Sequence, residues 1–73
     1  MNAIEREWNE IAARLPDLRT NDCVIAVLPS GRESVLKERE RAPLGIAESY
    51  HTERVPVSSE DLVERLRKAL AEG

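Results

Sequence analysis

The sequence has very few of the residues that carry catalysis or that staple small secreted domains together. Among its 73 residues are one cysteine, one histidine, one tryptophan, one tyrosine and no phenylalanine. A single cysteine excludes an intramolecular disulfide, whereas small secreted domains usually contain several. We therefore expect a protein of the reducing cytoplasm.

Long apolar runs are missing as well. The longest one, residues 23–28, is far shorter than the roughly 18 residues that a membrane span needs. Residues 1–15 mix charged and apolar residues, which is not the pattern of a secretory signal. Leu, Ile and Val still provide 18 of the 73 residues, enough to favour a folded chain. We expect one small domain spanning residues 1–73, with no membrane partner and marginal stability on its own.

A surplus of basic charge is also absent. The chain has 11 basic and 14 acidic residues, a net charge of −3, whereas domains that bind nucleic acid usually carry a basic surplus or stripe. The one basic stretch is 32–41, where four cations alternate with three glutamates and no aromatic side chain is near for base stacking. This segment favours a solvated face, and a nucleic-acid contact is the alternative.

Two segments have the periodicity of amphipathic helices. In residues 3–15, Ile4, Trp8, Ile11 and Leu15 recur with helical spacing. Pro16 is predicted to end this helix, because proline disfavours the helical conformation of the residue before it. Residues 16–22 are then a turn-rich connection. Trp8 is interpreted as a core anchor, with a protein interface as the alternative.

The second helix is predicted over residues 59–72. Ser58 is the expected N-cap, with Asp61 three residues later in a variant of the capping box. The apolar stripe that follows has the spacing of a helix face packed on a core. Its members are Leu62, Val63, Leu66, Ala69 and Leu70.

The middle of the chain reads as extended structure. Residues 23–28 predict a strand buried on both faces, because they form an unbroken apolar run bounded by turn residues. Residues 29–42 allow two interpretations. In one, Pro29, Ser30 and Gly31 form a hairpin turn that leads into a strand over 32–38. In the other, Ser30 and Glu33 form a capping box for a helix that ends at Pro43.

Residues 46–57 also look extended, with one irregularity. Their apolar positions change face near Glu53 and Arg54, which predicts a bulge or a strand end there. Pro56 lacks a backbone N–H and so belongs on a sheet edge or outside the sheet. Together these elements predict an α+β fold: two terminal helices packed on one face of a small, mainly antiparallel sheet of two or three strands.

No group of residues has the spacing of a catalytic or metal site. His51 has no second histidine or cysteine at ligand spacing. Cys23 begins the most apolar run, where a thiol is inert. The turn at Gly31 and Arg32 matches neither common phosphate-binding motif. We expect no catalytic residues, no metal and no cofactor, and therefore a protein that is not an enzyme.

These observations favour a non-catalytic cytosolic protein that binds a macromolecule, with another protein as the preferred partner. Regulators, inhibitors, antitoxins and phage accessory proteins fit this description, and a homodimer is compatible with it. The order of helix, Gly-containing hairpin and capped helix resembles that of small phage head–tail joining proteins, with no shared motif. The alternatives are a nucleic-acid-binding regulator that uses 32–41, and a small subunit of a multi-component enzyme or phage particle. Candidate partner-binding residues are Arg32, Lys37, Arg39, Arg41, Tyr50, His51 and Arg54.

Overall fold

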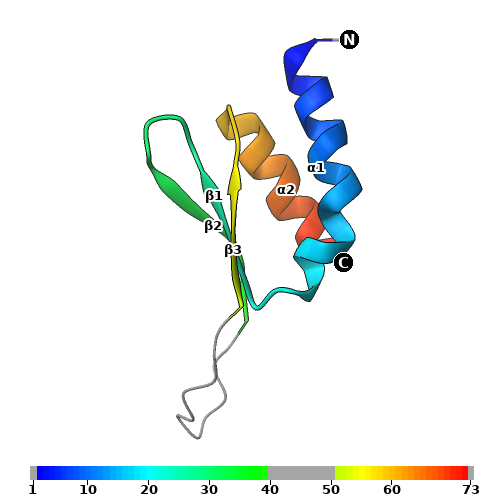
Figure 1. The fold of residues 1–73 in the computed structure, drawn as a ribbon, viewed down its shortest axis with the longest axis vertical. Helices are drawn as coiled ribbons and strands as arrows, with labels where there is room; N and C mark the ends of the chain where they lie inside the picture. The colour runs from blue at the N-terminus through cyan, green and yellow to red at the C-terminus, as the bar shows by residue number, and fades with distance from the viewer. Residues whose placement is uncertain (1, 40–50, 73) are drawn as a thin grey trace, which may run out of the picture.

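The part of the chain that the structure describes folds into two helices and a three-stranded sheet. The computed structural model describes residues 2–39 and 51–72. The elements follow the order α1 (Ala3–Thr20), β1 (Cys23–Val27), β2 (Glu33–Glu38), β3 (Thr52–Pro56) and α2 (Glu60–Glu72). Both helices lie on the same face of the sheet (Figure 1). The predicted α+β fold with two terminal helices is confirmed. Within the described ranges, no helix is long and apolar enough to cross a bilayer.

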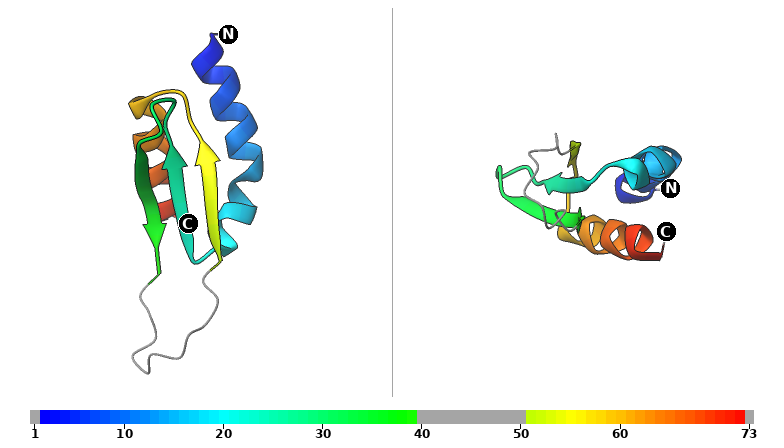
Figure 2. Two further views of the ribbon diagram at one scale, coloured as in Figure 1. Left: turned by 60° about the vertical axis from the view of Figure 1, so that its left-hand side comes forward. Right: turned by 90° about the horizontal axis from the view of Figure 1, so that it is seen from below.

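The sheet is mixed, whereas the sequence predicted a mainly antiparallel one. Its strand order is β2-β1-β3, with β1 antiparallel to β2 and parallel to β3. Figure 2 shows β1 between its two neighbours. Because β3 pairs with the far edge of β1 and not with β2, the most apolar strand has partners on both edges. The pattern of apolar residues along β3 could not indicate which edge it would join.

The connection between β1 and β2 is a tight turn, so the hairpin interpretation is confirmed and the helical one is wrong. The backbone N–H of Gly31 donates to the Leu28 carbonyl at 2.8 Å, and Leu28 N–H donates to the Arg32 carbonyl at 2.9 Å. Pro29 supplies the backbone angle needed at the second position of the turn. Gly31 has a φ of 90°, a conformation that side chains with a Cβ rarely adopt. The turn residues themselves therefore stop a helix from forming here.

Helix α1 continues past Pro16, so the prediction that it ends at residue 15 is wrong. Only Asn21 and Asp22 remain to connect α1 with β1. A proline inside a helix removes one backbone hydrogen bond and costs about 3 kcal/mol. The extra turn offsets this cost because it buries Leu18, which is 1% exposed. Burial against the sheet thus outweighs the local preference of the residue before proline.

Helix α2 begins one residue later than predicted. Ser59, not Ser58, accepts the capping hydrogen bond at its Oγ from Leu62 N–H, at 3.4 Å. Ser58 instead donates to the Glu7 carboxylate on α1, through its backbone N–H at 2.9 Å and its hydroxyl at 2.5 Å. This link fixes the start of α2 against the N-terminal half of α1.

Strand β3 is regular, so the predicted irregularity near Glu53 and Arg54 is wrong. The pairing with β1 is continuous over the whole of β3. The bulge lies instead in β2, where Leu36 is the extra residue opposite the Val24–Ile25 step of β1. Pro56 is the last residue of an edge strand, as predicted. Residues 46–50 of the predicted extended segment lie outside the described residues.

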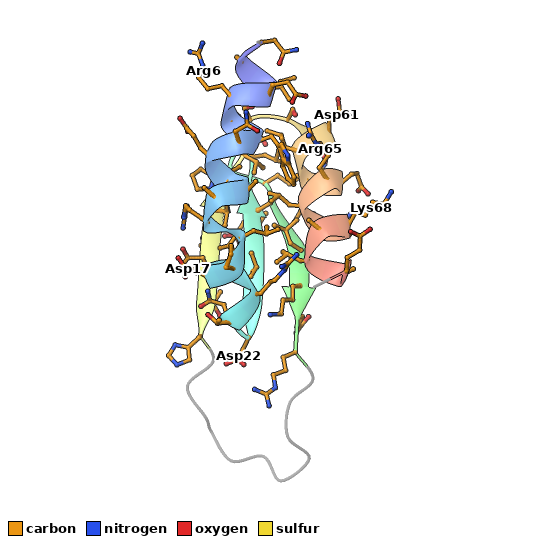
Figure 3. The ribbon with its side chains drawn as sticks, turned by 90° about the vertical axis from the view of Figure 1, so that its right-hand side faces the viewer. Arg6, Asp17, Asp22, Asp61, Arg65 and Lys68 are labelled. Carbon is orange, nitrogen blue, oxygen red and sulfur yellow. The ribbon has the colours of Figure 1, made fainter. Side chains whose placement is uncertain are left out.

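The core fills the space between the sheet and the two helices. Figure 3 shows α1 in front of β3 and β1, with α2 in front of β2. Trp8 is half-buried against this core, and the Arg65 guanidinium lies 4.4 Å from the centre of its ring. The buried apolar residues are Ile11, Leu15, Leu18, Val24, Ala26, Leu28, Leu36, Val55, Val57, Leu62, Val63, Leu66 and Leu70.

Candidate functional site

The face of the sheet that points away from the helices is the main candidate surface, and we call it the open face. Cross-strand partners in a sheet share a face, so the strand register identifies its residues. Three rows of three residues cross it from β2 through β1 to β3. They are Val35, Ile25 and Arg54; Glu33, Val27 and Pro56; and Glu38, Cys23 and Thr52.

Apolar side chains occupy the middle of the open face. Ile25 and Val27 of β1 are half-buried, although the sequence predicted β1 to be buried on both faces. Val35 beside Ile25 is 49% exposed, and Pro56 beside Val27 is exposed as well. Both described helices lie on the other side of the sheet, so β1 is apolar on a face that they leave uncovered.

One ion pair crosses the open face from strand to strand. The Arg54 Nε on β3 lies 2.9 Å from the Glu33 Oε2 on β2, with β1 between them. Both side chains are well exposed, at 60% and 49%. An exposed pair of this kind adds little to stability in water. Its relevance is that it places a positive and a negative group on opposite sides of the apolar centre, and Glu38 adds a second carboxylate on the β2 side.

A shallow hollow of about 420 Å³ adjoins the open face near the hairpin turn. Val27 and Pro56 belong to both the hollow and the open face. The other residues that line it come from α1, the turn and the segment after β3: Glu7, Leu28, Pro29, Val57 and Ser58. The apolar surface of the open face therefore continues around the end of the sheet.

Both edges of the sheet are poorly suited to accept another strand. The β2 edge has the bulge at Leu36 and carries charged residues such as Glu33 and Glu38. The β3 edge ends in Pro56, which has no N–H to donate. Bulges, charges and prolines are common means of blocking edge-to-edge pairing. A partner of this sheet is therefore expected on its open face rather than along its edges.

The structure distributes the predicted partner-binding residues over both ends of the sheet. Arg32 lies at the hairpin end and pairs with Glu60 at 2.9 Å. Lys37 Nζ donates to the Arg19 carbonyl at the end of α1. Of the described candidates, Arg54 alone belongs to the open face, where it lies on the edge strand β3 beside Ile25. The role of these residues stays a prediction.

Two further candidates, Arg39 and His51, contact Asp22, which lies at the opposite end of the sheet from the hairpin turn (Figure 3). The Asp22 carboxylate accepts hydrogen bonds from His51 N–H and Arg39 Nη1, both at 3.2 Å. The His51 carbonyl accepts from the N–H groups of Asp22 and Cys23, at 3.0 and 3.1 Å. Asp22 thus ties the end of β2 to the start of β3. Arg41 and Tyr50 lie outside the described residues.

These contacts hold the pKa of Asp22 below its ordinary value of 3.8, chiefly through the His51 N–H and then through Arg39. The ionised carboxylate therefore favours the folded state. Its contribution to stability is complete above the ordinary pKa and is lost as the pH falls through the lower pKa of the folded chain.

We expect Asp22→Asn to show a smaller loss of stability on acidification than the wild type, measured by urea unfolding across the acidic range. Asp17→Asn, the same change on the exposed side of α1, is the matched control. Parallel curves for wild type and Asp22→Asn would contradict the role of Asp22.

The apolar residues of the open face were missed because they carry no reactive group, whereas Arg54 on the same face was among the predicted candidates. The signal for them is in the sequence: a strand that is apolar on both faces needs cover on both, and two terminal helices can cover only one. Over the described ranges, no group of three or more His, Cys, Asp or Glu side chains could hold a metal ion.

Comparisons with known proteins do not relate this chain to others. No protein-family model, no curated protein and no solved structure matches it. Its function must therefore be argued from its own surface.

Proposed function

We propose that this is a non-catalytic protein of the cytoplasm that acts by binding another protein through the open face. The observation that supports this proposal is the central strand, whose residues Ile25 and Val27 are apolar on a face that the helices leave uncovered. The fully desolvated centre of a protein interface is typically apolar, with charged groups at its rim. Val35 and Pro56 extend the apolar centre, and Arg54 and Glu33 flank it.

The charges of the basic segment favour a protein partner over nucleic acid. Phosphate binding needs cations that can release their counterions to the backbone. Arg32 is paired with Glu60, and Arg39 with Asp22, so part of the positive charge is already neutralised within the chain. The apolar open face offers more surface to a protein than these paired cations offer to phosphates.

A capture experiment with a matched control tests the proposal. Val35→Asp places a charge on the open face beside Ile25, where the wild-type side chain is already 49% exposed. Ile4→Asp makes the same change on α1, where the side chain is 37% exposed. Tagged wild type, Val35→Asp and Ile4→Asp are incubated with lysate, with and without nuclease, and bound proteins are identified by mass spectrometry.

We expect a nuclease-resistant protein to bind the wild type and Ile4→Asp but not Val35→Asp. Circular dichroism should show that both variants are folded. A set of proteins that disappears with nuclease would favour the nucleic-acid alternative. A stoichiometric partner that binds Val35→Asp as well as the wild type would move the binding surface away from the open face.

A further inference from the structure

We propose that the occupant of the open face is a second copy of this chain, bound around a two-fold axis that runs parallel to β1. This inference rests on the proposed function, because it assigns the partner of the same face. It starts from the arrangement of charge: the face carries one cation, Arg54, on its β3 side and two carboxylates, Glu33 and Glu38, on its β2 side, and Glu33 is the one that pairs with Arg54. A surface with this arrangement is complementary to itself.

The geometry follows from the strand register. Rotation about an axis parallel to β1 places the β3 of each copy over the β2 of the other and keeps every residue at its level along the strands. Ile25 and Val27 then meet their own counterparts in the second copy. Arg54 faces Val35 of the second copy. Glu33 of the second copy lies on the same β2 strand, two residues before Val35. Packed sheets lie about 10 Å apart, a gap that these two long side chains can bridge from opposite sides.

The direction of the axis is selected by the same charges. An axis perpendicular to the strands, midway between the Ile25 and Val27 levels, would place Arg54 over Pro56 of the second copy and near Arg54 of the second copy. That arrangement brings two like charges near one another and makes no Arg54–Glu33 contact between the copies. The axis parallel to β1 instead makes two equivalent Arg54–Glu33 pairs between the copies, and it gives the aligned packing of common β-sandwiches.

The size of the face predicts a weak dimer. Three strands of five or six residues cover roughly 15 Å by 17 Å on each copy, which is smaller than the interfaces of stable complexes and fits only a weak, transient association. A chain this short buries little apolar surface by itself. Dimerisation would remove further apolar surface from water, at Ile25, Val27, Val35 and Pro56. Association therefore stabilises the fold by mass action.

Charge reversal tests the pairing, with sedimentation velocity over about 1 μM to about 1 mM as the measurement. We expect the wild type to pass from monomer to dimer in this range. Arg54→Glu and Glu33→Arg should each weaken self-association about tenfold or more, because each places like charges opposite one another. An equimolar mixture of the two variants should recover dimers, since the introduced carboxylate of one variant then meets the introduced guanidinium of the other. Arg14→Glu, which breaks the exposed Arg14–Glu53 pair, should dimerise like the wild type.

Recovery on mixing is the decisive result. Both single variants also lose the Arg54–Glu33 pair within the chain, and mixing cannot restore that pair, so recovered dimers must come from contacts between copies. A dimer that Arg54→Glu leaves unchanged, or variants that stay monomeric when mixed, would overturn the inference. A wild type that is monomeric throughout would overturn it too. If Val35→Asp then still loses a captured protein, the open face binds a different partner and the proposed function stands.

Discussion

Val55→Asp is expected to unfold the chain. Val55 is completely buried on the helix-facing side of β3, and the described core contains no buried polar or charged side chain. An aspartate at this position would have no partner for its charge, and burial of an unpaired carboxylate costs several kcal/mol even after the protein relaxes. A domain of this size has only about 4 to 11 kcal/mol of stability in total. Far-UV circular dichroism and thermal unfolding measure the outcome.

Val35→Asp is the matched control, because it introduces the same residue on the other edge strand of the sheet but on the open face. Val35 is 49% exposed, so its carboxylate would remain in water and the chain should stay folded. The two variants together test the assignment of the two sheet faces. If both unfold, the open face is covered within the single chain. If both fold, β3 is not packed against the helices as described.

Leu66→Ala is expected to lower the free energy of unfolding by about 2 to 5 kcal/mol, through lost transfer energy and the cavity left behind. Leu66 has no exposed surface and lies in the middle of α2, facing the sheet. The midpoint and slope of urea unfolding give this quantity directly.

The control for this change is Ile4→Ala, in the first turns of α1. Ile4 is 37% exposed, so its truncation leaves no cavity and should cost less than about 1 kcal/mol. Equal losses for the two variants would show that the side of α2 bearing Leu66 does not form the core. A change only in the slope of the unfolding free energy against urea concentration would indicate an altered unfolded state instead.

Hydrophobic periodicity predicted both helices and the helix-facing side of the sheet, because burial enforces it directly. Leu62, Leu66 and Leu70 are buried as their spacing indicated. The hairpin was one of the two predictions for residues 29–42, because Pro29 fixes its own φ and Gly31 can adopt the positive φ that the turn requires. The continuation of α1 through Pro16 was not, because it depends on how much surface Leu18 buries against elements far away in the sequence.

The candidate site was harder to predict from the sequence than the fold was. The sequence analysis selected mostly positively charged residues as candidates for partner binding. The structure places two of them, Arg32 and Arg39, at opposite ends of the sheet, each paired with a carboxylate. The open face depends instead on which edge of β1 accepts β3, and that is a tertiary choice. Once β1 is central and both helices lie on one side, the exposure of Ile25 and Val27 follows.

The mixed sheet also has a consequence for the order of folding. The β1–β2 hairpin closes through a tight turn, whereas the β1–β3 pairing joins residues as far apart as Cys23 and Thr52. Contacts between distant residues form slowly, because more chain entropy is lost before they contribute. The hairpin can therefore exist for a time with one edge of its most apolar strand unpaired. In that interval, the edge that later receives β3 is open to any other extended chain, and the risk of aggregation through this edge ends only when β3 docks.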